Sequence, residues 1–167
     1  MHETALRLGP ICQLRLPLMF HVALVEPEIP PNTGNIARLC AATKTPLHIV
    51  GVTGFRMDDR TLKRSGLDYW DHVDLHRHID LESLWNALPA SRFLYFTTKV
   101  DRPYTQWNFI DGDCLVFGPE TRGLPEKLLA DNADRCLTIP MANPNVRSLN
   151  LSTSVGIALY EATRQVS

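Results

Sequence analysis

The stretch FHVALVEPEIPPNTGNIARLC, residues 20–40, sets the pattern on which the rest of the chain is built. Its first part, Phe20–Val25, is an apolar run that a Glu-Pro pair ends, which predicts a short buried strand. Apolar residues then recur at helical spacing over Asn32–Thr43, and Asn32 or Thr33 is placed to cap that helix. The stretch therefore predicts a strand that leads directly into a helix.

The same alternation of apolar runs and helical patterns continues along the chain. Further strands are predicted at Leu47–Val52, Val73–Leu75, Phe93–Thr97, Cys114–Phe117 and Cys136–Ile139. Further helices are predicted at Asp58–Ser65, Leu81–Leu88, Pro125–Ala130 and Leu149–Gln165. Such alternation is typical of an α/β domain whose mostly parallel sheet is covered by helices on both faces. Because ligands of such sheets bind at the carboxyl ends of the strands, we expect the site in the loops after Val25, Thr97, Phe117 and Ile139.

The length of 167 residues suits one domain. We assign residues 19–167 to it and treat residues 1–18, which show no clear fold pattern, as an N-terminal extension. No apolar run is long enough to span a bilayer, and a secretory cleavage site is missing. Four widely spaced cysteines fit buried reduced thiols, so we expect a cytoplasmic protein without membrane or metal.

The formal net charge of −1 argues against a protein that holds nucleic acid by bulk charge. Any contact with RNA must come from local basic patches. Two candidates are present, and an ordinary solvated surface is the alternative for both. They are Arg56, Arg60, Lys63 and Arg64, and then Lys99 with Arg102.

The helix of the opening stretch carries a first candidate site. Asn35 and Arg38 lie three residues apart and so share one helix face near the positive end of the helix. That arrangement suits a phosphate or a ribose. Exposed polar residues on an ordinary capped helix remain the alternative.

A second candidate site is FGPETRGLP, residues 117–125. The span from Gly118 to Gly123 matches a phosphate loop in length, but neither a Walker signature nor a dinucleotide fingerprint is present. Glu120 and Arg122 in this tight loop fit a small-ligand site or a structural ion pair equally well.

A third candidate site is IPMANPNVRSLNLSTS, residues 139–154. It places more hydrogen-bonding side chains around a helix start than capping requires, namely Asn145, Arg147, Ser148, Asn150 and Ser152. The histidines between residues 72 and 78 are less informative, because their irregular spacing favours a solvated edge over a metal site.

Together, in this order, the three segments resemble the SPOUT RNA methyltransferases, and among them the small bacterial enzymes that methylate the wobble cytidine or uridine of tRNA. The similarity covers Phe20 to Gln165 and includes SGLDYW at 65–70 and FTTK at 96–99. Two departures are visible. Val146 stands where relatives commonly have serine, and Lys44-Thr45 replaces a turn that contains glycine.

The resemblance implies a C-terminal deep trefoil knot, S-adenosylmethionine as cofactor, tRNA as substrate and a homodimer whose interface completes the site. We expect the first and last helices to form that interface. The implied cofactor contacts are Phe96, Gly118, Ile139, Ser148, Leu149 and Asn150. The implied RNA contacts are Asn32, Gly34, Glu120, Arg122 and Arg147, and the implied catalytic residues are Arg38, Asn35 and Ser152.

The implied reaction is transfer of a methyl group to a ribose 2′-oxygen. Relatives suggest Arg38 as the base, but a guanidinium normally stays protonated. We therefore expect Arg38 to clamp a phosphate and to stabilise the developing alkoxide, while Asn35 and Ser152 orient the ribose. The alternatives are the same chemistry at another tRNA or rRNA position, and a non-catalytic RNA-binding or assembly factor with the same fold.

Overall fold

The computed structural model describes residues 20–55 and 69–167. Within these ranges six strands form one sheet in the order β3-β2-β1-β5-β4-β6, and every neighbouring pair is parallel. The strands are β1 (His21–Val25), β2 (Leu47–Val50), β3 (Leu75–His78), β4 (Phe93–Phe96), β5 (Cys114–Phe117) and β6 (Cys136–Leu137). The expected parallel sheet is confirmed, and its strand order changes direction beside β1, where α/β sheets bind ligands.

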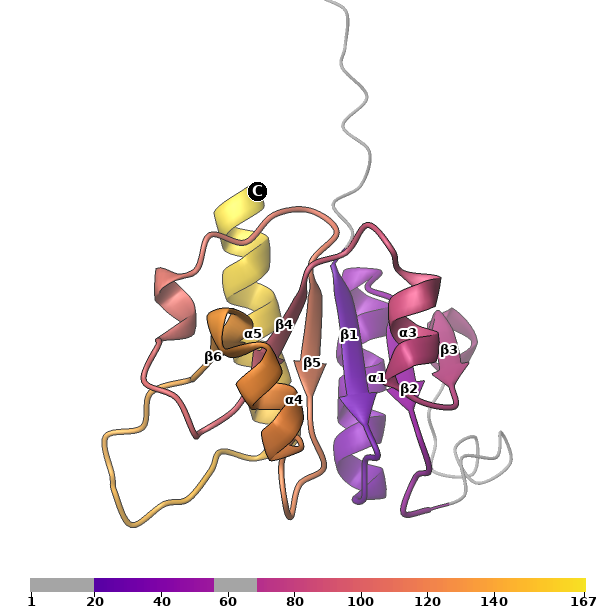
Figure 1. Cartoon of the computed structure of the whole chain (residues 1–167). Coiled ribbons are helices and arrows are strands. Elements are labelled where there is room, and N and C mark those ends of the chain that lie inside the picture. The colour runs from indigo at the N-terminus through magenta and orange to yellow at the C-terminus, as the bar shows by residue number, and fades with distance from the viewer. Residues whose placement is uncertain (1–19, 56–68) are drawn as a thin grey trace, which may run out of the picture.

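Helices cover both faces of the sheet (Figure 1). One face packs against α1 (Pro30–Thr43) and α5 (Leu151–Val166), and the other against α3 (Leu81–Ala87) and α4 (Glu126–Asp131). Alternate residues of β1 divide between the two cores, since Val22 and Leu24 face α1 and α5 while Ala23 lies on the other side. The expected α/β class is therefore confirmed.

Short 3-10 turns complete the described elements. They are η1 (Trp70–His72), η2 (Tyr104–Gln106) and η3 (Ala133–Arg135). None of the helices in residues 20–55 and 69–167 is long and apolar enough to cross a membrane.

Some element boundaries differ from the expectation. The first helix begins at Pro30, because prolines suit its first positions, so Asn32 and Thr33 lie buried inside the first turn and do not cap it. The predicted strand at Val73–Leu75 is wrong, since β3 runs from Leu75 to His78. The predicted helix at Asp58–Ser65 lies outside the described residues.

The turn after α1 contains Lys44, one of the two departures from the relatives. Lys44 takes the left-handed conformation, with φ of 53°, and its N–H bonds the carbonyls that end the helix. Glycine is the usual residue in that conformation because it has no Cβ. Lysine therefore occupies a position where glycine would cause less backbone strain.

Three of the four cysteines are free and buried, as expected. Burial raises the pKa of the Cys40 thiol to about 12 and also raises the pKa values of Cys114 and Cys136. Such thiols stay protonated and unreactive at neutral pH. Cys12 lies outside the described residues.

A row of histidines crosses three strands of the sheet. His48 on β2 is buried, and its ring nitrogens lie 3.0 Å from His21 Nδ1 on β1 and 2.9 Å from His78 Nε2 on β3. The ring of His76 stacks on His48, with centroids 4.9 Å apart, and binds Asp74 at the solvated edge. Burial, reinforced by the neighbouring histidines, lowers the pKa of His48 to about 3.

The histidine row predicts that the folded protein loses stability in acid. The unfolded chain protonates His48 near its ordinary pKa of about 6.5, whereas the folded chain resists protonation down to about pH 3. The free energy of unfolding should therefore hold above pH 6.5 and fall as the pH drops below it, by up to about 1.4 kcal/mol per pH unit for one proton. Urea unfolding of wild type and His48→Leu between pH 7.5 and 5 checks this. A slope unchanged in the variant would reject the assignment.

Candidate active site at the carboxyl edge of the sheet

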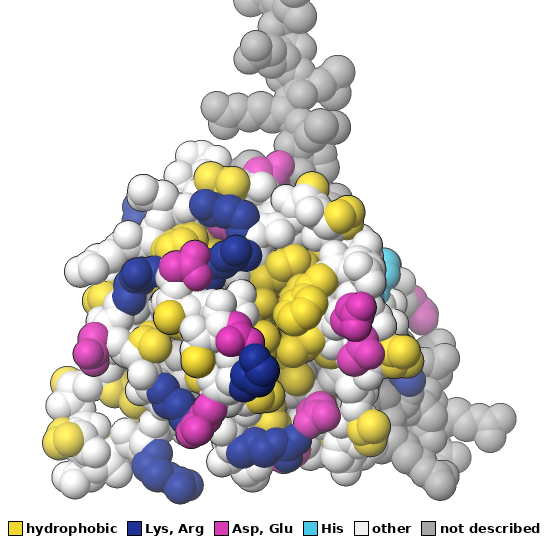
Figure 2. Space-filling view, in the orientation of Figure 1, with side chains coloured by type: hydrophobic (Ala, Val, Ile, Leu, Met, Phe, Trp, Pro, Cys, Tyr) yellow, Lys and Arg dark blue, Asp and Glu magenta, His cyan; other side chains and the backbone are white. Residues whose placement is uncertain are grey.

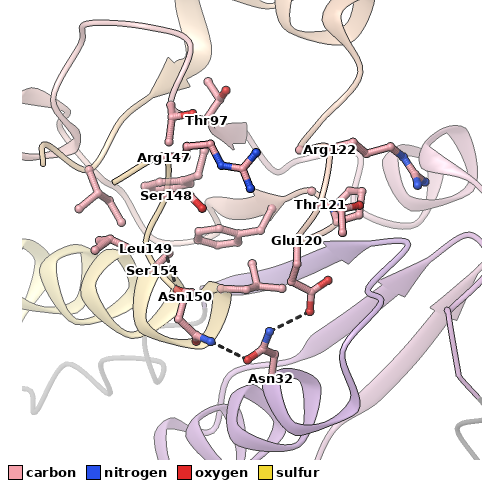
Figure 3. Close-up of a pocket in the computed structure, with 18 of the residues that line it drawn as sticks. Asn32, Thr97, Glu120, Thr121, Arg122, Arg147, Ser148, Leu149, Asn150 and Ser154 are labelled. Atoms are coloured by element: carbon pink, nitrogen blue, oxygen red, sulfur yellow. Dashed lines mark hydrogen bonds between the residues drawn. The ribbon is translucent and has the colours of Figure 1, made fainter. Parts of the chain in front are cut away.

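A cavity of about 470 Å³ opens at the carboxyl ends of β1, β4, β5 and β6 (Figure 3). Its walls come from the loops where the sequence placed the site and from the start of α5. The lining consists of residues 96–99, 117–123 and 147–151 together with Ile29, Asn32, Ile139, Met141 and Ser154. A cavity is thus present at the carboxyl edge, where the sequence analysis expects the site.

All six residues expected to contact the cofactor line this cavity. They are Phe96, Gly118, Ile139, Ser148, Leu149 and Asn150. The ring of Phe96 stacks on Phe117 with centroids 4.7 Å apart, so the cavity has an aromatic wall beside polar main chain and hydroxyl groups. A flat apolar base joined to a charged amino-acid end requires such a mixed lining, so these residues fit S-adenosylmethionine.

Three polar side chains form a continuous chain at the base of the cavity (Figure 3). Asn32 Nδ2 donates to Glu120 Oε1 at 3.0 Å, and Asn150 Nδ2 donates to Asn32 Oδ1 at 2.8 Å. Asn150 Oδ1 in turn accepts the N–H of Ser152, which makes Asn150 the N-cap of α5. The chain therefore joins the loop after β5 to the first turns of α1 and α5.

Glu120 also caps α1 from outside that helix. Its carboxylate accepts the N–H groups of Glu28 at 2.9 Å and Ile29 at 3.2 Å, and Ile29 is the N-cap residue. A negative charge at this end is favoured by the helix dipole. Glu120 is expected to face RNA, and within this chain its carboxylate also joins the cavity loop to the start of α1.

The two arginines expected to contact RNA differ in their surroundings. Arg122 pairs with Glu26 and, at 3.1 Å, with Glu28, and its guanidinium points away from the cavity (Figure 3). Arg147 reaches across the cavity, and no ion pair joins it to any residue of the described ranges. Arg147 is thus the cation that is available to an anionic ligand.

The expected catalytic residues do not join this cavity within one chain. Asn35 and Arg38 are exposed on α1 and do not line it, and the Ser152 hydroxyl donates to Asn150 Oδ1 at 2.7 Å. Gly34 lies on the same helix, and a methyl group at its Cα would meet no atom of the described residues within 4 Å.

The basic patches expected to meet RNA are tied into the protein where they are described. Lys99 pairs with Glu126 at 3.1 Å, while Arg102 lies over Trp107 and donates to the carbonyl of Asp134. On the face formed by α3 and α4, basic and acidic side chains are interspersed around an apolar area (Figure 2). The patch from Arg56 to Arg64 lies outside the described residues.

Some lining residues were not singled out from the sequence. Thr97 and Thr98 follow β4 directly, at a strand end where the sequence analysis expects the site without naming them as contacts. Ser154 lies one helical turn beyond Asn150 and donates to its carbonyl at 3.1 Å. Its spacing of four residues from Asn150 was the available signal. Met141 gave no such signal.

Similarity to known proteins extends over most of the chain, including the three candidate segments. Residues 19–160 match the model of the SpoU rRNA Methylase family. The chain belongs to this family. The matched residues include all six strands and every residue that lines the cavity.

Two relatives within the SpoU family are similar over nearly their whole length. The tRNA (cytidine(34)-2'-O)-methyltransferase of Methylovorus glucosotrophus is 48% identical over 88% of this chain and 96% of its own. The protein of the same name from Escherichia coli K12 is 47% identical over 89% of this chain and 94% of its own.

Solved structures agree with this placement. One described as giving insights into the 2-OH methylation of C/U34 on tRNA is 48% identical, with a TM-score of 0.82 over 89% of this chain and 97% of that chain. An AdoMet-bound rRNA methyltransferase from Sinorhizobium meliloti is 26% identical, with a TM-score of 0.76 over 89% of this chain and 57% of that one. The SpoU fold therefore carries an AdoMet site in a protein similar to this chain.

Proposed function

We propose that this chain is a cytoplasmic S-adenosylmethionine-dependent methyltransferase that modifies the ribose 2′-oxygen of the wobble cytidine or uridine in tRNA. The observation that carries the proposal is the cavity, in which all six expected cofactor residues meet above the Glu120–Asn32–Asn150 chain. S-adenosylmethionine, when bound, supplies a methyl group already activated by its sulfonium sulfur. The protein then has to align the ribose and to help its proton leave.

The cavity residues would divide the work of binding. Phe96, Ile139 and Leu149 offer apolar surface to the base, and the main chain at Gly118 and Ser148 offers hydrogen bonds. Arg147 offers a positive charge to an anionic group. The Glu120–Asn32–Asn150 chain fixes the relative position of the loops that carry these groups.

A homodimer would bring the catalytic residues to this cavity. Arg38 follows the cavity residue Asn32 by six positions, which turns it about 240° around the axis of α1. Asn32 and Arg38 therefore point in different directions from α1, and we infer that a second copy supplies Arg38, with Asn35 beside it, to this cavity. Arg38 would clamp an RNA phosphate and stabilise the developing alkoxide, with the proton passing to phosphate or water.

The other candidate functions have weaker support. Both relatives described above carry names that specify cytidine 34 of tRNA, which favours the wobble position over another tRNA or rRNA site. A non-catalytic RNA-binding factor would not need a cavity in which all six expected cofactor residues meet.

The direct test uses purified protein, tritiated S-adenosylmethionine and bulk tRNA that lacks the modification. We expect label in 2′-O-methylcytidine or 2′-O-methyluridine at the wobble position after digestion. Label at another position would support the same chemistry at a different site. Cofactor binding without transfer to any tRNA or rRNA would support the non-catalytic factor instead.

A further inference from the structure

Tyr69 is tied to the helix that carries Arg38. Its hydroxyl donates to the main-chain carbonyl of Gly34 at 3.0 Å, across 35 positions of sequence. In a regular α-helix that same carbonyl accepts the N–H of the residue four positions on, which here is Arg38. The hydroxyl of Tyr69 therefore binds α1 in the turn that holds Arg38.

The ring of Tyr69 also meets the side chain of Arg38. The guanidinium carbon lies 5.5 Å from the ring centroid, within the range of a cation–π contact. Tyr69 is half-buried, packs on the core and precedes the buried Trp70, whereas Arg38 is exposed. The ring is thus the anchored partner of the pair and the guanidinium is the mobile one.

A neutral partner has a particular advantage for Arg38. No carboxylate within residues 20–55 and 69–167 forms an ion pair with its guanidinium. A carboxylate would compete with an RNA phosphate for the charge, whereas an aromatic face directs the cation and leaves its N–H donors available.

We infer that Tyr69 is a positioning residue that holds the Arg38 guanidinium in the orientation needed for methyl transfer, a role that rests on the proposed function. The hydroxyl fixes the ring against α1, and the ring limits the rotamers of Arg38. Less side-chain freedom is then lost when RNA arrives.

The kinetic test compares Tyr69→Leu, Tyr69→Phe and Tyr104→Leu. Tyr104 is also partly buried and packs on the same core, but it is not among the residues that line the cavity, so it controls for loss of stability. We expect kcat to fall about tenfold in Tyr69→Leu and about threefold in Tyr69→Phe, with cofactor affinity unchanged.

The control variant Tyr104→Leu should keep the kcat of wild type. In an Arg38→Ala background, Tyr69→Leu should cause no further loss, because it acts through Arg38.

A spectroscopic test separates this inference from the proposed function. The ring current of Tyr69 should shift the Arg38 Nε–H signal upfield, and the shift should remain in Tyr69→Phe and disappear in Tyr69→Leu. An unshifted signal, or an unchanged kcat in a folded Tyr69→Leu protein, would overturn the inference while the function stood. Absence of transfer by wild type would reject the function, and the Arg38 signal would still decide the contact.

Discussion

Arg38→Ala is expected to lower kcat for methyl transfer by at least about 100-fold, the usual cost of removing one group that stabilises developing charge. Binding of S-adenosylhomocysteine, followed by calorimetry, should not change, because the proposed partners of Arg38 are the RNA phosphate and the ribose, and none of the six expected cofactor contacts is Arg38. Arg38→Lys keeps the charge but loses the planar fork of donors, so we expect only partial activity. Near-full activity of the lysine variant would reject a two-pronged clamp on phosphate.

The same variant tests whether the site is shared between two copies. Co-expression of differently tagged Arg38→Ala and Asn150→Ala chains allows the mixed dimer to be isolated. If Arg38 serves the partner's cavity, the mixed dimer has one intact site and about half of wild-type activity. If Arg38 serves its own cavity, both sites of the mixed dimer are defective. An inactive mixed dimer would therefore rule out sharing.

Gly118→Ala is expected to weaken the binding of S-adenosylhomocysteine by at least about 100-fold, since displacements of about 1 Å have effects of that size. A Cβ at this position would lie 2.4 Å from Leu124 N and 2.5 Å from the Gly123 carbonyl carbon. These are main-chain atoms, so the loop of residues 118–124 has to move, and it forms one wall of the cavity.

Gly156→Ala is the matched control for that variant. Its Cβ would lie 3.9 Å from Leu39 Cδ2, an ordinary contact, and alanine favours a helix interior by about 1 kcal/mol over glycine. We expect wild-type affinity and equal or higher thermal stability. Calorimetry gives the affinity and thermal unfolding separates a shifted loop from an unfolded protein. Wild-type affinity in Gly118→Ala would show that the loop does not shape the cofactor site.

The fold was largely predictable because its signals are local. Apolar runs such as Phe20–Val25 and Cys114–Phe117 end at Pro or Gly, and the structure places strands on both. The histidine strand was misplaced because period and composition gave no preference for β3. Its register is instead set by pairing with β2, where His48 lies opposite His76.

The site was predictable in its location and less so in its roles. The loops could be predicted because ligands of parallel sheets bind at the carboxyl ends of the strands, and the topology alone brings these ends together. It could not show that Glu120 turns toward α1, because that depends on hydrogen bonds across 88 and more positions of sequence. Nor could it show that Tyr69 meets Arg38, which follows from the packing of η1 against α1.

The hydrogen bond between Asn32 and Asn150 determines when the cavity is completed during synthesis of the chain. The two residues lie 118 positions apart, so a ribosome needs about 6 to 24 s to add the second after the first. During that interval Asn32 lacks its partner Asn150, and the cofactor cavity lacks the wall formed by residues 147–151. A nascent chain with most of its sheet already assembled is therefore still unable to act on RNA. The chain can bind cofactor and act on RNA only after α5 has packed against the sheet and Asn150 has bonded to Asn32.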